Sequence, residues 1–212
     1  MDPRHTAFAS RLLVPLWGLM VCCGMFQLQQ YANTPNLGAL APARYPEELS
    51  PLRKPDCSTL LVFVHPRCPC STATIGELER LVARLNPEVL VHVVFWHPEG
   101  LPANWHETAL WQQACRVPRI NVIDDVGCVL TRRFGVLTSG QTVLYDAAGR
   151  LRFAGGITMA RGHAGDNPGS DHVLSMAGTG PITGDTGPMC CQVFGCPLQE
   201  AENRAATLTS KK

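Results

Sequence analysis

The chain has 212 residues, of which 45% are hydrophobic and 17% are charged, and its formal net charge is +1. This composition is that of one folded domain with appendages and excludes a largely disordered chain. No basic face or stripe is visible, so we expect no nucleic-acid partner. Ten cysteines are many for a cytosolic chain of this size, and they indicate an oxidising compartment, thiol chemistry or metal binding.

An apolar run near the N-terminus is the first predicted element. Residues 12–31 are uncharged, and about 20 such residues span a bilayer. Arg4 and Arg11 precede the run, and no Lys or Arg follows it until Arg44. The positive-inside rule therefore predicts a cytoplasmic segment 1–11, a transmembrane anchor and a single-pass inner-membrane protein with a periplasmic C-terminal domain. The alternative is a cleaved signal peptide, because the strongly apolar part is only about 15 residues long.

A proline-rich segment follows the apolar run. Residues 32–55 contain five prolines, and such a density favours an extended, semi-rigid spacer. The folded domain is then expected over residues 56–198, and a polar tail over residues 199–212.

The folded domain begins with a strand, a helix and a second strand. Residues 60–64 and 89–95 are short, continuous apolar runs, which is typical of strands buried on both faces. Between them, apolar residues recur at helical spacing over 75–85, and Thr74 with Glu77 has the spacing of a capping box at a helix start.

The second half of the domain continues this alternation and ends in a hairpin. A parallel beginning with an antiparallel end predicts an α/β fold, in which a central mixed sheet is flanked by helices. Asp124 and Asp125 have no obvious paired acid and are assigned to a loop at a strand end. The elements expected here are a helix over 105–114, a strand over 120–123, a short helix over 127–133 and hairpin strands over 142–145 and 151–154.

The motif Cys68-Pro69-Cys70 lies where the first strand ends and the first helix begins. The unpaired N–H groups and partial positive charge of a helix N-terminus stabilise a thiolate, and Arg67 beside the pair is expected to act in the same direction. A thiolate is both the nucleophile of disulfide exchange and a soft metal ligand. Cys68 and Cys70 are therefore the candidate catalytic residues.

These motifs carry a resemblance to a known superfamily. The order strand, Cys-Pro-Cys, amphipathic helix resembles the strand, Cys-X-X-Cys, helix of the thioredoxin superfamily, and Phe134-Gly135-Val136 is similar to the lead into that family's last two strands. More narrowly, the chain resembles RedB-type membrane-anchored proteins over roughly residues 55–198. This resemblance implies a thioredoxin-like fold, partner proteins with extracytoplasmic thiols or disulfides, and no required cofactor. The RedB-like pieces are His65 to Ser71, 155–158, 161–167 and 193–197.

Two features depart from the thioredoxin pattern. The cysteine pair is one residue shorter than usual, and a Cys68–Cys70 disulfide would be strained and easily reduced. In addition, Gly140 takes the position where thioredoxins place the cis-proline whose neighbours receive the partner peptide. Both departures count against ordinary dithiol–disulfide exchange.

Three further cysteines follow a stretch rich in Gly, Thr and Pro. This flexible link could bring Cys190, Cys191 or Cys196 back to Cys68 or Cys70 as a resolving thiol. The alternative is a structural disulfide near the C-terminus.

Two histidines extend the candidate set toward metal binding. His65 with Cys68 and Cys70 offers one nitrogen and two sulfurs, which suit Cu(I) or Zn. His163 lies in the polar loop 161–167 and is a further candidate ligand. The competing interpretation is that His65 is a hydrogen-bonded turn residue and that the loop is a structural turn.

Three functions follow from the sequence. The first is a membrane-anchored, extracytoplasmic thiol–disulfide oxidoreductase, with Cys68 as nucleophile and Cys70 as resolver, or the reverse. The second is a protein that binds and delivers copper. The third is a non-catalytic thioredoxin-fold module, in which the thiols serve only stability.

Overall fold

A computed structural model describes residues 3–36, 38, 41–54, 56–177 and 187–198. The chain forms two compact units, one that ends at Thr34 and one that begins at Pro35.

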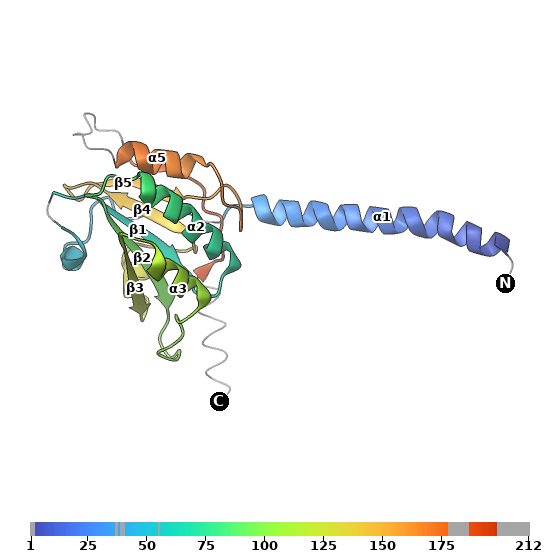
Figure 1. Cartoon of the computed structure of the whole chain (residues 1–212), viewed down its shortest axis with the longest axis horizontal. Helices are drawn as coiled ribbons and strands as arrows, with labels where there is room; N and C mark the ends of the chain where they lie inside the picture. Colours follow the sequence, from blue (N-terminus) through green and yellow to red (C-terminus); the bar gives the residue numbers. More distant parts are fainter. Residues whose placement is uncertain (1–2, 37, 39–40, 55, 178–186, 199–212) are drawn as a thin grey trace. The chain divides into compact units, whose positions relative to one another are not determined.

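The first unit is the helix α1 (Pro3–Asn33), drawn in blue in Figure 1. The predicted helix over 12–31 is thus present, and its large apolar side chains from Leu13 onward are exposed. The transmembrane part of the prediction is not borne out: within the described residues, no helix has both the length and the apolar character needed to cross a membrane.

The second unit is built on a six-stranded mixed sheet in the order β3-β2-β1-β4-β5-β6 (Figure 1). The pairs β1–β2, β2–β3 and β5–β6 are parallel, and the pairs β1–β4 and β4–β5 are antiparallel. The predicted α/β fold with a central mixed sheet is therefore confirmed. The strands are β1 (Thr59–Val64), β2 (Leu90–His97), β3 (Ile120–Val126), β4 (Gln141–Tyr145), β5 (Leu151–Gly156) and β6 (Met189–Cys190).

Each face of the sheet has its own core, because successive side chains of a strand point to opposite faces. In β1, Leu60 and Val62 belong to one core, whereas Leu61 and Phe63 belong to the other. Figure 1 shows the helices of the first face in front of the sheet. The first face is covered by α2 (Pro69–Arg84), α3 (Ala109–Arg116) and α5 (Pro168–Met176), and the second by α4 (Val129–Arg133) and the 3-10 helix η1 (Glu47–Leu52).

The helix α2 begins six residues earlier than the capping-box spacing of Thr74 and Glu77 predicts. Its first residue is Pro69, and Cys68 is the N-cap, with extended backbone angles (φ −91°, ψ 122°). Thr74 lies inside the helix, so the predicted capping box is wrong. Proline at the first helical position already has the φ angle of a helix and lacks only an N–H that would be unpaired there, which is why the helix starts at Pro69.

The segment before β1 packs on the domain. Tyr45 is only 5% exposed, and its ring meets Phe134 and Tyr145 edge-on, with centroids 5.4 and 5.2 Å apart. The N–H of Tyr45 donates to the carbonyl of Gly149 at 2.8 Å. The prediction of a spacer over 32–55 is therefore wrong for this part, because its extended backbone pairs with the hairpin and its aromatic residue fills the core.

Candidate thiol site

The site begins at the end of β1, the central parallel strand. The chain leaves the sheet at His65, turns, and enters α2 with Cys68 as the N-cap residue. The N–H of Cys68 donates to the carbonyl of His65 at 3.2 Å, and the N–H of Ser71 donates to the carbonyl of Cys68 at 3.0 Å. Cys68 is 5% exposed, and Cys70 is half-buried.

The fold brings a third thiol to this turn. The Sγ atoms of Cys68, Cys70 and Cys196 all lie within 4.8 Å of one another. The other two candidate partners do not join them: Cys190 is exposed beside β5, and Cys191 packs against the backbone of Gly155. Within the described residues, no two cysteines are joined by a disulfide. We call Cys68, Cys70 and Cys196 the thiol cluster.

Backbone pairing holds Cys196 in place. The N–H of Ser139 donates to the carbonyl of Cys196 at 2.9 Å, and the N–H of Leu198 donates to the carbonyl of Leu137 at 2.9 Å. Thr138 and Pro197 form an antiparallel bridge between the two segments. Residues 196–198 therefore run beside residues 137–139 as a short added strand.

A glycine makes this close approach possible. A Cβ atom on Gly195 would overlap the carbonyl of Ser139. The carbonyl of Gly195 accepts hydrogen bonds from Asn36 Nδ2 at 2.6 Å and from the guanidinium of Arg161. Arg161 also donates to Asn36 Oδ1 at 3.0 Å, so two residues distant in sequence fix the segment that carries Cys196.

The loop 161–167 connects the C-terminal segment to α2 and α5 through hydrogen bonds. Glu77 of α2 is buried, and its carboxylate accepts from the N–H of Gly165 at 3.2 Å and from Ser170 Oγ at 3.3 Å. Asn167 caps α5 by accepting from the N–H of Ser170 at 2.8 Å. The loop is thus a structural turn that ties α2 and α5 to the C-terminal segment. His163 in this loop is exposed.

The turn before β4 closes the site from the other side. Ser139 Oγ accepts from the N–H of His65 at 2.9 Å and lies 2.8 Å from Ser71 Oγ. The N–H of Gly140 donates to the carbonyl of Phe63 at 2.7 Å, and Gly140 has a φ of +91°, which favours glycine. No cis peptide bond occurs among the described residues.

The three thiols differ in acidity. The pKa of Cys68 is lowered, chiefly because the thiols of Cys196 and Cys70 donate to its sulfur; nearby N–H groups of Cys70 and Ser71 add to this, and burial opposes it. The pKa of Cys196 is raised, first because its thiol donates to Cys68 and then because of Cys70 and burial. For Cys70, the contact with Cys196 lowers the pKa, but the contact with Cys68, burial and the charge of Cys68 together raise it. Within the cluster, these shifts favour a thiolate on Cys68 over one on Cys70 or Cys196.

The other predicted residues near the motif have different roles. The ring of His65 stacks on Trp96 with centroids 5.0 Å apart, and His65 Nδ1 accepts from the N–H of Arg67 at 3.0 Å. The pKa of His65 is lowered, mainly by burial. Arg67 places its guanidinium 3.8 Å from the ring centroid of Trp105, so its charge is used in a cation–π contact rather than directed at the thiols.

The ligand set predicted from sequence is thus only partly brought together. Within the described residues, the group of possible metal ligands at this turn contains Cys68, Cys70 and Cys196 but neither His65 nor His163. The imidazole of His65 turns toward Trp96 instead. The spacing of His65 and Cys68 in the sequence does not reveal this orientation.

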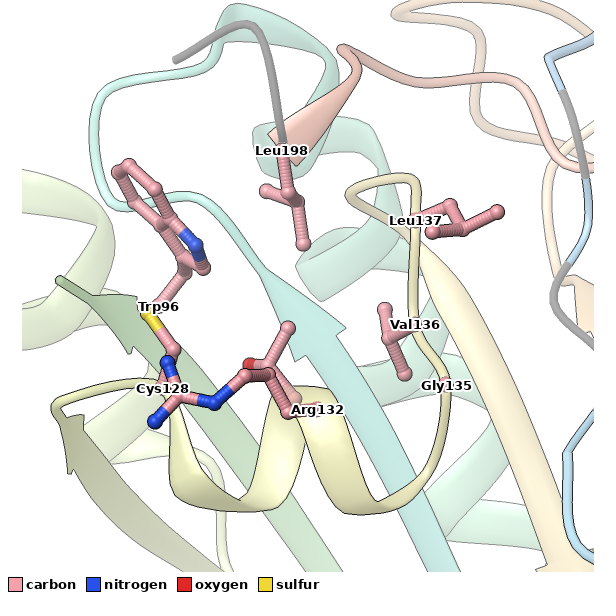
Figure 2. Close-up of a pocket in the computed structure, with 8 residues that line it drawn as sticks. Trp96, Cys128, Arg132, Gly135, Val136, Leu137 and Leu198 are labelled. Atoms are coloured by element: carbon pink, nitrogen blue, oxygen red, sulfur yellow. The ribbon is translucent and has the colours of Figure 1, made fainter. Parts of the chain in front are cut away.

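A pocket of about 320 Å³ lies beside the added strand. Figure 2 shows Trp96 and Cys128 on its left side and Val136 and Leu137 on its right. Leu198 also lines it, whereas no member of the thiol cluster does. The pocket therefore flanks the segment that carries Cys196 and is separate from the reacting sulfurs.

The topology decides the fold family. Two parallel crossovers β1-α2-β2 and β2-α3-β3 are followed by an antiparallel hairpin, and a cysteine turn lies between the central strand and α2. The fold is thioredoxin-like. The RedB-type subgroup is not confirmed and remains a resemblance.

Comparisons with known proteins agree on the fold alone. No protein-family model matches the chain, and no curated protein matches it significantly. A hypothetical protein from Sinorhizobium meliloti 1021 is similar in structure at 18% identity and a TM-score of 0.51, over 79% of this chain and 96% of its own. An uncharacterized protein from Geobacillus kaustophilus is similar at 18% identity and a TM-score of 0.53, over 78% of this chain and 95% of its own. DsbF of MTB matches at 16% identity with a TM-score of 0.42, over 58% of this chain and 80% of its own.

Proposed function

We propose that this protein is a thiol–disulfide oxidoreductase in which Cys68 is the nucleophile. The observation that carries the proposal is the thiol cluster itself: three sulfurs lie within 4.8 Å of one another at a helix N-terminus, and the pKa of Cys68 is lowered there. A thiolate is the species that attacks a disulfide, and a neighbouring thiol is what resolves the product.

In the first step, the thiolate of Cys68 attacks one sulfur of a partner disulfide. The Cys68–partner S–S bond forms, the partner's own S–S bond breaks, and the leaving sulfur departs as a thiolate that takes a proton from water. This step consumes the negative charge on Cys68.

In the second step, Cys196 resolves the mixed disulfide. The hydrogen bond to the Cys68 thiolate and the charge of that thiolate raise the pKa of Cys196 in the resting protein. Once Cys68 is bonded to the partner, both effects vanish, and Cys196 loses its proton more readily. It attacks Cys68, releases the partner as a dithiol, and leaves a Cys68–Cys196 disulfide. The partner gains two electrons, the protein loses two, and the reverse steps run when a partner dithiol reduces this disulfide.

Cys196 is a better resolving thiol than Cys70. A disulfide between residues two apart needs a bent backbone, whereas Cys196 reaches Cys68 from a separate segment, so that a Cys68–Cys196 disulfide does not require this bend. Cys70 is then the third thiol, able to exchange with either sulfur.

The added strand 196–198 limits how a partner can bind. It uses the N–H of Ser139 and the carbonyl of Leu137, and the resemblance to thioredoxins implies that a partner peptide docks beside this turn. A partner therefore displaces residues 196–198 or approaches beside them, where the pocket of Figure 2 offers apolar walls.

We place this chemistry outside the cytoplasm. Ten cysteines and a redox-capable cluster are typical of proteins in oxidising compartments. Labelling of intact cells with a membrane-impermeant thiol reagent tests this location, because exposed Cys115 is modified only if the domain lies outside.

The function is tested by trapping the disulfide. The full chain is equilibrated in glutathione buffers of graded potential and quenched with acid and alkylating reagent, and its disulfides are mapped by mass spectrometry. We expect one reversible two-electron transition that forms Cys68–Cys196, and reduction of insulin disulfides in the presence of a dithiol donor. Cys115→Ser is the matched control and is expected to behave as wild type.

The proposal fails if Cys68→Ser retains insulin reduction, or if no disulfide within the thiol cluster forms at any potential. Cys196→Ser separates the steps: we expect it to accumulate the mixed disulfide with glutathione on Cys68. If Cys70→Ser accumulates it instead, Cys70 is the resolver.

The second candidate function is copper binding, and one observation favours it. Three sulfurs within 4.8 Å match the preference of Cu(I) for thiolate ligands. Titration of the reduced chain with Cu(I) against a chelator distinguishes the two functions. Stoichiometric binding lost in Cys196→Ser, together with no insulin reduction, would favour metal delivery.

A further inference from the structure

A second cluster of ligating side chains lies at the carboxyl ends of β2 and β3. His97 is the last residue of β2, Asp124 lies in β3, and His106 belongs to the turn before α3. Parallel pairing sets Asp124 opposite Phe95, two residues before His97. We call these three residues the imidazole–carboxylate cluster. The sequence assigned Asp124 to a loop at a strand end and therefore did not predict this cluster.

The three side chains converge through one carboxylate. His97 Nδ1 lies 2.8 Å from Asp124 Oδ1, and His106 Nδ1 lies 3.0 Å from Asp124 Oδ2. One ligand atom from each residue can be chosen so that all three atoms lie within 4.8 Å of one another. Ligand atoms around one tetrahedral ion with N and O bonds of about 2.0–2.2 Å lie roughly 3.3–3.6 Å apart, so small movements of these side chains would let all three bind one metal.

The ring nitrogen Nδ1 of His106 gives the stronger evidence for a metal site. Its Nδ1 is buried and makes no hydrogen bond, although Asp124 Oδ2 is only 3.0 Å away. The contact is therefore close but wrongly directed for an N–H donor. A buried polar nitrogen without a partner is costly, and a cation placed between this nitrogen and the carboxylate would satisfy it.

The surroundings fix the two imidazoles. The ring of His106 packs on Trp111 with centroids 4.2 Å apart, and the side chain of His97 is 3% exposed. Asp124 remains 22% exposed, which leaves a direction from which a metal and a water ligand can enter.

We propose that His97, His106 and Asp124 form a binding site for a divalent transition metal ion, with Zn²⁺ as the best-matched ion. Two imidazole nitrogens and one carboxylate oxygen are a donor set that zinc uses, with a fourth position for water. The site joins β2, β3 and the turn before α3, and this turn also carries Trp105, on which Arg67 stacks. A bound metal would therefore stabilise the turn before α3, which lies beside the thiol cluster. This inference does not depend on the proposed redox function.

The test uses Co²⁺ as a spectroscopic probe in the full chain. Cys68, Cys70 and Cys196 are all replaced by Ser, so that the thiol cluster cannot bind the metal. We expect one equivalent of Co²⁺ to give visible d–d bands without thiolate charge-transfer bands, Zn²⁺ to displace it, and one equivalent of Zn²⁺ to raise the Tm.

Two variants on this background identify the ligands. His106→Ala removes the least buried imidazole, and Asp124→Asn keeps the shape of the carboxylate. Because loss of even a supporting partner of a ligand costs about 10–100-fold in metal affinity, we expect each variant to weaken Zn²⁺ binding by at least about 100-fold. Circular dichroism without metal checks that both variants fold.

Asp125→Asn and His172→Ala are the matched controls. Asp125 is the neighbouring carboxylate, and its oxygens instead accept from the N–H groups of Leu130 and Thr131. Both controls are expected to bind Zn²⁺ as the background does. The proposal is overturned if the background binds no metal, if its Co²⁺ spectrum shows thiolate ligation, or if folded His106→Ala and Asp124→Asn bind Zn²⁺ unchanged.

Discussion

The thiol cluster and the imidazole–carboxylate cluster occupy the same edge of one sheet and differ in how they are built. The thiol cluster combines a helix N-cap, Cys68, with a residue more than 100 positions later, and its chemistry depends on a charge that a helix end stabilises. The imidazole–carboxylate cluster uses two adjacent parallel strands and a turn that lies between them in the chain. The comparison teaches that one edge of a sheet can hold a soft, reactive sulfur site beside a harder nitrogen and oxygen site.

The largest expected effect is that of Cys68→Ser, which should change the activity of the thiol cluster and leave the imidazole–carboxylate cluster unaffected. Loss of the nucleophile should lower insulin reduction by at least about 100-fold, since thiolate attack is the first step of exchange. Zn²⁺ binding by the imidazole–carboxylate cluster should be unchanged, because Cys68 is not among its ligands. Activity assays and Co²⁺ spectra on the same preparation check both statements. If Cys68→Ser also loses the metal, the two clusters are not separate.

The thiol cluster should contribute to the pH dependence of stability. The pKa of Cys68 is lower in the folded protein than its usual value near 8.5. The folded state then binds fewer protons, so stability rises with pH up to about 8.5 and is lost as the pH falls. The pKa values of Cys70 and Cys196 are raised, so their contribution is fully present below about pH 8.5 and is lost at higher pH.

Together these shifts predict that the reduced protein is most stable near pH 8.5, relative to Cys68→Ser. Urea unfolding of both proteins in reducing buffer, from pH 5 to pH 10, checks this expectation. A difference between the two that does not vary with pH would show that Cys68 is protonated in the folded protein.

The position of Cys196 relative to Cys68 should depend on Gly195. The variant Gly195→Val places a Cβ against the carbonyl of Ser139, and we expect it to lower the population of the Cys68–Cys196 disulfide by about 10-fold, which corresponds to about 1.4 kcal/mol. Mass mapping at fixed potential measures this fraction. Unchanged pairing in Gly195→Val would mean that the added strand does not position Cys196.

Two neighbouring aspartates offer a sharper contrast. Asp125 is buried, and its Oδ2 also accepts from Thr131 Oγ1 at 2.6 Å, so its carboxylate caps the short helix α4. Asp125→Asn is expected to lower the free energy of unfolding by about 1–2 kcal/mol, as for other lost caps. Asp124→Asn should instead lose metal affinity. Urea titration without metal distinguishes them, and equal stability losses would remove the contrast.

The smallest expected effect lies in the helix that carries the thiols. Gly76 is inside α2, and a Cβ there would meet no heavy atom within 4 Å. Gly76→Ala should therefore raise the free energy of unfolding by about 0.5–1 kcal/mol, without changing disulfide formation or metal binding. A change in the reduction potential would show that the helix backbone tunes Cys68 more finely than we expect.

Much of the fold could be predicted because its signals are local. Residues 60–64 and 90–95 of the predicted apolar runs lie in strands, and the turn between 145 and 151 closes a hairpin, as expected. The helix α5 (Pro168–Met176) was not predicted, although Asn167 followed by Pro168 is a helix-start signal.

The sequence by itself determined the alternation of strands and helices and the placement of Cys68 at a helix N-terminus. These features depend on residues close together in the chain, whose apolar period and backbone preferences act locally. Only the tertiary structure decided which thiol meets Cys68, because Cys190, Cys191 and Cys196 are equivalent until residues 196–198 pair with 137–139. Likewise, Asp124 meets two histidines only because parallel pairing brings separate strand ends to one edge of the sheet, and no local pattern encodes such a meeting.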